Sequence, residues 1–203
     1  MKEWKRLPLV CATLVAINVI VFLCCQFTGV RLYELGELSL RKVVQDREYG
    51  RIIWAMFLHI GTMHIFNNML VLYFLGAMIE KEIGHIRFGI VYFVSGIAGN
   101  LISLAHKYMT ADPVPSVGAS GAVFGLDGVI LALVLFSGKM KNVSPRRVLL
   151  MIALSLYGGF TGTNIGNDAH IGGLLAGFFL GVLICIGDRV RNNKQYGGDN
   201  VEY

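Results

Sequence analysis

The chain has 203 residues, of which 55% are hydrophobic and only 15% are charged, whereas soluble domains carry about 25% charged residues. This composition excludes an ordinary soluble protein. It predicts an all-α, polytopic membrane protein, because apolar stretches of roughly 20 residues, long enough to cross a bilayer, recur along the chain. The net charge of +5 does not indicate binding to nucleic acid, since the Lys and Arg residues cluster in short segments between the apolar stretches. The first apolar stretch is long for a signal peptide and no small-residue cleavage site follows it, so we expect no cleaved leader.

Six transmembrane spans are predicted within a single domain over residues 1–187, followed by a short polar cytoplasmic tail, 188–203. The predicted spans, in chain order, are 7–27, 64–83, 87–105, 119–136, 147–161 and 169–186. An even number of spans places both termini on one side of the membrane, and the segments on that side hold 12 of the 18 Lys and Arg residues. Positive charge accumulates in cytoplasmic segments. We therefore expect cytoplasmic termini, a location in the cell membrane, and a fourth span that begins at the outer side.

The long loop before the second span, 28–63, mixes charged residues with Leu, Ile, Trp and Phe. Such a segment is typical of chain that lies along the membrane interface rather than across it. We expect this first loop to lie on the outer surface.

The cysteines lie within or at the ends of apolar stretches and lack the spacing of metal ligands. They are Cys11, Cys24, Cys25 and Cys185. We expect neither a disulfide nor a metal site, and nothing in the sequence indicates a cofactor.

Ser120 stands at the start of the fourth span between Gly118 and Gly121. Its small neighbours leave the hydroxyl approachable, and the free N–H groups at a helix start favour negative charge. Such a serine could act as a nucleophile, and the N–H groups would stabilise the oxyanion that its attack creates. The alternative is a helix-capping serine flanked by packing glycines, and this segment alone favours the alternative.

His170 lies near the start of the sixth span, above glycines that share its helical face. These glycines are Gly173, Gly177 and Gly181, and the fourth span carries a matching stripe of Gly121, Gly125 and Gly128. Small residues let two helices approach closely. If the stripes meet, Ser120 and His170 lie at the same depth and within hydrogen-bonding reach. A lone buried histidine more often forms a hydrogen bond with a carbonyl than it acts in catalysis. The paired stripes make the catalytic interpretation the preferred one.

The second span opens with His64 and Asn68, which are four residues apart and so share one helical face. Both side chains carry hydrogen-bond donors inside the membrane, where burying such groups is costly. They could join two helices by hydrogen bonds, or they could form an oxyanion hole together with the Ser120 backbone N–H.

Taken together, these motifs resemble those of rhomboid intramembrane serine proteases. The family's Gly-x-Ser-Gly corresponds to residues 118–121, its His-x-x-x-Asn to 64–68, and its Ala-His-x-x-Gly-x-x-x-Gly to 169–177. The Gly-x-x-x-Glu-x-x-x-Gly of the second span corresponds to 76–84, and a further family histidine corresponds to His59. The resemblance covers essentially the whole chain and implies the six-span rhomboid-like fold.

The resemblance also implies roles for individual residues. Ser120 would be the nucleophile and His170 the general base of a Ser-His dyad. His64, Asn68 and the Ser120 N–H would bind the oxyanion, and Phe124 would pack against His170. The supporting glycines of the motifs are Gly118, Gly121, Gly173 and Gly177, and Arg51 corresponds to the arginine of the family's Trp-Arg signature.

Three positions depart from the family pattern. Gly50 replaces the usual tryptophan before Arg51, so the first loop must pack differently, with Trp54 as a candidate substitute. Phe124 lacks the hydroxyl of the more common tyrosine. Asp127 is an acid deep in the fourth span, and we expect it to be neutral and to donate a hydrogen bond to a neighbouring helix.

The expected function is that of an intramembrane serine endopeptidase that hydrolyses peptide bonds in or near transmembrane helices of membrane-protein substrates. Its partners would be those substrates and the lipid bilayer, and the glycine-rich segment 158–164 is expected to act as a gate or cap. A transporter or channel, using Asn100 and Asp127 as intramembrane ligands, is one alternative. A catalytically inactive rhomboid-like binding protein is the other. The sequence does not indicate an oligomeric state.

Overall fold

The computed structural model describes residues 7–28, 31–138, 140, 142–161 and 167–197, and these residues form helices joined by short connections. The long helices are α1 (Leu9–Thr28), α7 (His85–Thr110), α8 (Ser120–Phe136), α9 (Pro145–Thr161) and α10 (Asn167–Gly197). The second predicted span is built from α5 (Thr62–Val71), the π-helical turn η3 (Leu72–Gly76) and α6 (Ala77–Ile83). The first loop holds the short elements α2 (Arg31–Gly36), α3 (Leu40–Val44), α4 (Arg51–Trp54) and η2 (Ala55–Phe57).

The predicted all-α membrane fold is confirmed, and helices occupy all six predicted ranges. Within the described residues, four stretches are long and apolar enough to cross a bilayer. They are Leu9–Thr28, Thr62–Ile83, His85–Thr110 and Asn167–Asn193. α8 is apolar but has only 17 residues, and α9 has the same length. The count of six membrane crossings therefore stays a prediction.

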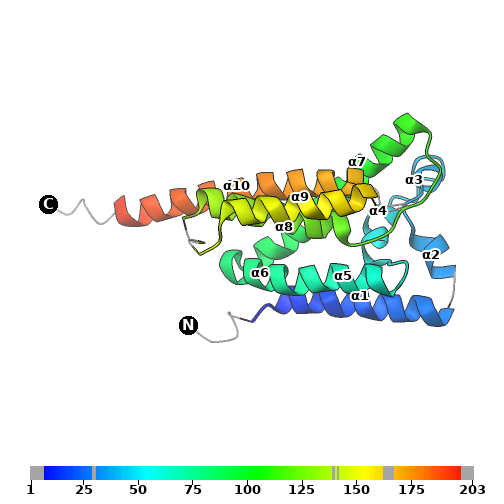
Figure 1. Cartoon of the computed structure of the whole chain (residues 1–203), viewed down its shortest axis with the longest axis horizontal. Helices are drawn as coiled ribbons and strands as arrows, with labels where there is room; N and C mark the ends of the chain where they lie inside the picture. Colours follow the sequence, from blue (N-terminus) through cyan, green and yellow to red (C-terminus); the bar gives the residue numbers. More distant parts are fainter. Residues whose placement is uncertain (1–6, 29–30, 139, 141, 162–166, 198–203) are drawn as a thin grey trace.

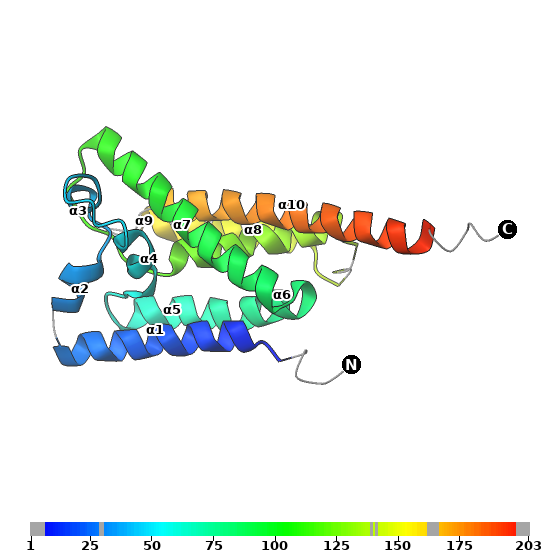
Figure 2. The same ribbon diagram turned by 180° about the vertical axis from the view of Figure 1, so that it is seen from behind.

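α8 is the central helix of the bundle. It lies beside α9 and α10, while α1, α5 and α6 form the adjoining layer. α7 runs across one face of the bundle at a steep angle, from the α10 side to the α6 side (Figures 1 and 2). Nearly every residue from Gly121 to Leu133 is buried. A helix that is apolar on all sides is expected in such a position.

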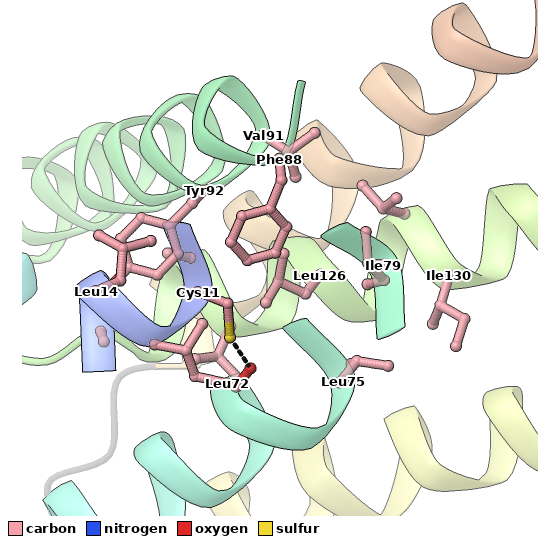
Figure 3. Packing of buried hydrophobic residues seen from close by; sticks show 14 of the residues in the cluster. Cys11, Leu14, Leu72, Leu75, Ile79, Phe88, Val91, Tyr92, Leu126 and Ile130 are labelled. Carbon is pink, nitrogen blue, oxygen red and sulfur yellow. Dashed lines mark hydrogen bonds between the residues drawn. The ribbon is translucent and has the colours of Figure 1, made fainter. Parts of the chain in front are cut away.

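The π-helical turn packs in the core where α1, α7 and α8 meet (Figure 3). Its Leu72 is fully buried, and the Leu72 carbonyl accepts a hydrogen bond from the Cys11 thiol at 3.1 Å. A π turn leaves backbone groups without their usual helical geometry. The thiol contact satisfies one of these groups inside the apolar core.

Glu80 ties the second span to the beginning of α1. Its carboxylate accepts the backbone N–H groups of Val10 at 2.9 Å and Cys11 at 2.7 Å, and it also contacts the His85 imidazole. The first N–H groups of a helix need partners from outside the helix. Glu80 supplies them although it is itself 1% exposed.

α10 continues to Gly197, well past the predicted end of the sixth span. The first ten residues of the expected polar tail are therefore helical and project beyond the bundle (Figure 2). Asp188 anchors the start of this extension through an ion pair of 2.7 Å with Arg87 on α7.

Candidate active site

The close approach of α8 and α10 shapes the site. A Cβ atom added at Gly173 would lie 1.9 Å from the Gly121 carbonyl oxygen, and one added at Gly177 would lie 1.9 Å from the Gly125 oxygen. No side chain fits at such distances, so only glycine permits this contact. The two stripes singled out in the sequence therefore face each other.

This approach brings Ser120 and His170 together. Ser120 is the first residue of α8, and its Oγ lies 2.9 Å from Nε2 of His170. The Phe124 ring, one turn further along α8, stacks on the imidazole with a centroid distance of 4.3 Å and an interplanar angle of 16°. His170 is 7% exposed, so the stacked ring and the surrounding helices restrict the imidazole to one orientation.

His170 has a second polar contact that sequence reasoning missed. Its Nδ1 lies 3.1 Å from Oδ1 of Asn167, the first residue of α10. Asn167 is buried as well, and its amide Nδ2 donates to the carbonyl oxygen of Leu156 on α9 at 3.3 Å. The signal available in the sequence was the spacing of three residues, which places Asn167 and His170 on one helical face.

His64 lies on the other side of Ser120, against Gly118. A Cβ atom at Gly118 would come within 2.9 Å of the His64 ring and 3.7 Å of Ser120 Oγ, so glycine leaves the space that the imidazole fills. Gly118 also has φ +136°, which an L side chain rarely adopts. Asn68, one turn further along α5, is buried, while Asn67 points to the exposed face. His64 thus lies against the segment just before the predicted nucleophile, and Asn68 shares its face of α5.

The first loop holds the segment before Ser120. Leu38 and Ser116 exchange two backbone hydrogen bonds of 2.9 and 3.2 Å, and the Gly118 N–H donates to the Ala55 carbonyl at 2.8 Å. These contacts fix the approach to α8 from a segment distant in sequence. The first loop is therefore a structural support of the candidate site.

His59 adds a side-chain support to the same segment. Its Nε2 accepts the Ala119 N–H at 3.3 Å, and its carbonyl accepts the Tyr33 hydroxyl at 2.7 Å. Burial, helped by the neighbouring His64, lowers the pKa of His59 to about 4. The imidazole is therefore neutral at pH 7, as an acceptor at Nε2 requires.

Arg51 organises the first loop from within. It is 5% exposed, and its Nη1 donates to the carbonyl oxygens of Glu34 at 2.8 Å and Glu37 at 3.0 Å. Trp54 is 58% exposed, so much of its ring lies outside the packed loop. Its substitution for the family's tryptophan stays a prediction, and the polar contacts of Arg51 hold the loop.

Asp127 is buried on α8, with 3% of its surface exposed. The expected hydrogen bond to a neighbouring helix is absent, since Oδ1 has no partner within the described part of the chain. A buried carboxyl oxygen without a hydrogen-bond partner is energetically costly.

One of the two residues considered as ligands for ion transport has a structural contact. The Asn100 amide donates to the Ile52 carbonyl at 2.7 Å and so joins α7 to the first loop. Among the described residues there is no group of three or more His, Cys, Asp or Glu placed to hold a metal ion. Of the expected gate, 158–164, residues 158–161 end α9 and the rest lies outside the described residues.

Comparison with known proteins agrees with the motifs. Residues 46–187 match the model of the Rhomboid domain. RHOMBOID-like protein 6, mitochondrial, from Arabidopsis thaliana is 38% identical over 82% of this chain and 55% of its own length. RHOMBOID-like protein 2 from the same plant is 37% identical over 82% of this chain and 50% of its own length. Rhomboid protease GluP from Bacillus subtilis (strain 168) is 32% identical over 81% of this chain and 32% of its own length.

The chain thus spans about half the length of the plant relatives and about a third of GluP. The matched domain contains the second to sixth helical ranges, including both glycine stripes and the Ser120–His170 contact. With its apolar helices and this domain, the chain belongs to the rhomboid family of multi-pass membrane proteins.

Proposed function

We propose that this rhomboid-family protein is an intramembrane serine endopeptidase in which Ser120 is the nucleophile and His170 the general base. The observation that carries the proposal is the 2.9 Å contact between Ser120 Oγ and His170 Nε2, held by the stacked Phe124. A nucleophile within hydrogen-bonding distance of a base, with the base oriented by a third group, is the arrangement required for covalent catalysis. A rhomboid-like binding protein would not need this contact.

The chemistry would follow from these positions. His170 Nε2 removes the hydroxyl proton as Ser120 Oγ attacks the scissile carbonyl carbon, and the carbonyl oxygen becomes an oxyanion. When the tetrahedral intermediate collapses, the C–N bond breaks and His170 returns its proton to the leaving amine. Water, activated by the same imidazole, then attacks the acyl-serine ester and regenerates the hydroxyl of Ser120.

The oxyanion would be stabilised by groups that border Ser120. As the first residue of α8, Ser120 has a backbone N–H without a partner inside the helix. His64 packs against Gly118 just before it, and the buried Asn68 on the same face of α5 would be the third donor. Donors fixed before the reaction cost no reorganisation when the charge forms. Gly118 leaves room for the His64 ring, while Gly121, Gly173 and Gly177 let α8 and α10 lie close enough for His170 to reach Ser120.

The substrates would be membrane proteins cut in or near their transmembrane helices, because the site lies at one end of a bundle whose outer faces are apolar. We propose that this end faces outward, with cytoplasmic termini in the cell membrane. Cysteines introduced at Asp112 and Arg147 test the orientation. An impermeant thiol reagent added to intact cells should label the first variant and not the second, and the reverse pattern would contradict it.

The function is tested with purified protein in lipid vesicles and a model transmembrane substrate. A fluorophosphonate probe should label Ser120, while Ser120→Ala and His170→Ala should lose cleavage yet keep the thermal unfolding transition of the wild type. Mapping the labelled peptide identifies the reactive serine. Cleavage that persists in Ser120→Ala would contradict the proposal.

A further inference from the structure

A continuous line of hydrogen bonds leads from α9 through Asn167 to Ser120. The Leu156 carbonyl accepts from Asn167 Nδ2 at 3.3 Å, Asn167 Oδ1 faces His170 Nδ1 at 3.1 Å, and His170 Nε2 faces Ser120 Oγ at 2.9 Å. Both Asn167 and His170 are buried, with 8% and 7% of their surfaces exposed. Water therefore competes little for these groups.

The Leu156 carbonyl decides which way the Asn167 amide points. A carbonyl oxygen only accepts hydrogen bonds, so the amide must present its NH₂ group to it. The amide oxygen, which is also only an acceptor, is then directed at His170 Nδ1. The opposite orientation would set two oxygens against each other and leave a buried NH₂ group facing the imidazole.

The direction of the amide in turn decides the tautomer of His170. Facing an oxygen, Nδ1 must carry the proton, so in the neutral ring Nε2 keeps its lone pair. That lone pair points at Ser120 Oγ and is the one that a general base needs. In a serine–histidine–aspartate triad, a third residue that favours the wrong tautomer lowers kcat by about 10⁴.

We propose that Asn167 is a positioning residue for the dyad, and that the Leu156 backbone carbonyl of α9 orients Asn167 for this task. The inference rests on the proposed protease function and deepens it, because it makes the competence of the base depend on where α9 lies. α9 is held on the bundle by the buried Val148 and Ile152, while its other apolar side chains up to Tyr157 are largely exposed. A shift of α9 that breaks the Asn167–Leu156 bond would free the amide to turn and His170 to change tautomer.

Three variants test the proposal in lipid vesicles. Asn167→Leu, which removes both polar ends at similar size, should lower kcat about 10-fold to 100-fold with KM within about twofold, a smaller loss than the 10²–10⁴ of an absent general base. Asn167→Asp should recover part of this loss, because a carboxylate oxygen accepts from Nδ1 whichever way the group turns, while the other oxygen is left against the Leu156 carbonyl. The added negative charge stabilises protonated His170, so the acid limb of the kcat/KM profile should move to higher pH. Asn192→Leu, the same change at an exposed position of α10, should behave as the wild type.

A spectroscopic readout separates this proposal from the protease assignment. In wild-type protein labelled with ¹⁵N-histidine, the His170 resonances should show Nδ1 protonated and Nε2 unprotonated, and Asn167→Leu should show a mixture. His170→Gln assigns the signals. A wild-type kcat in Asn167→Leu, or an unchanged tautomer, would overturn the proposal while leaving the protease function intact. If Asn167→Leu does not fold, the positioning proposal is overturned when the acid limb of the kcat/KM profile does not move in Asn167→Asp. A wild-type protein that neither cleaves the substrate nor reacts with the probe overturns both the positioning proposal and the protease function.

Discussion

Replacement of Gly177 by alanine should disable the proposed site from a distance. The new Cβ atom would lie 1.9 Å from the Gly125 oxygen and 2.5 Å from its carbonyl carbon, whereas a carbon and an oxygen in contact are separated by about 3.3 Å or more. Both obstructing atoms belong to the backbone, so no side chain can turn away. α8 and α10 must therefore separate by more than about 1 Å.

This separation would act on the dyad although the mutation is remote. Gly177 is seven residues beyond His170, about 10 Å along the helix at 1.5 Å per residue. The Ser120–His170 contact of 2.9 Å would open beyond about 3.5 Å, where a hydrogen bond is lost. Overpacking costs about 1–3 kcal/mol where side chains can adjust, and a backbone clash places Gly177→Ala at the upper end of that range or above it.

Turnover of a transmembrane substrate and thermal unfolding measure these two effects. Gly187→Ala is the matched control, because it lies on the same helix and nothing is within 4 Å of its added Cβ. Alanine there should leave turnover unchanged and raise stability by up to about 1 kcal/mol through helix propensity. The reasoning is refuted if Gly177→Ala cleaves like the wild type and unfolds no earlier than Gly187→Ala.

Three further predictions follow from buried polar groups. Asn68→Ala should lower kcat by about 10²–10³, the usual loss for one oxyanion donor, while the exposed Asn67→Ala stays near wild type; equal losses would indicate packing. Because the pKa of His59 is lowered to about 4 by burial and by the neighbouring histidine, the unfolded chain binds the additional proton, so the free energy of unfolding should fall as pH drops from about 6.5 towards 4. In His59→Gln the free energy of unfolding should depend less on pH in this range, and an unchanged slope would exclude His59 as the titrating group. Asp127→Leu should keep activity and raise stability by about 1–3 kcal/mol, because it removes an unpaired buried polar group, and a lower melting temperature would show that the carboxyl has a partner.

The sequence allowed the pairing of α8 and α10 to be predicted because glycine spacing encodes it directly. A glycine every three or four residues on one face of two helices favours a close contact, and the positions of Ser120 and His170 at corresponding helix starts follow from the same register. The irregular structure of the second span could not be predicted in the same way. Gly76, the last residue of its π-helical turn, lies close to Cys11 and Phe88 from two other helices, and no local sequence pattern predicts such contacts.

Asn167 escaped prediction for a similar reason. Its partner on α9 is a backbone carbonyl, and every residue has one, so no sequence pattern identifies Leu156. The support of the serine segment by the first loop was equally hidden, since the Leu38–Ser116 pairing uses backbone atoms of two segments far apart in the chain. Side-chain motifs predict the chemically active groups, but the contacts that orient these groups emerge only from the tertiary fold.

The close packing of α8 and α10 and the proposed chemistry impose the same requirement on the chain. Helices in proteins usually pack with their axes about 8–10 Å apart, and a serine side chain extends only one atom beyond Cβ. In this bundle the two helices approach more closely than ordinary side chains allow, and His170 Nε2 meets the hydroxyl at 2.9 Å. Gly173 and Gly177 remove the side chains that would hold α10 away. Glycine normally destabilises a helix interior by about 1 kcal/mol relative to alanine, and close packing between membrane helices offsets this loss. The stripes by themselves indicate packing, and their position beside Ser120 and His170 is what connects the close approach to the proposed hydrolytic role.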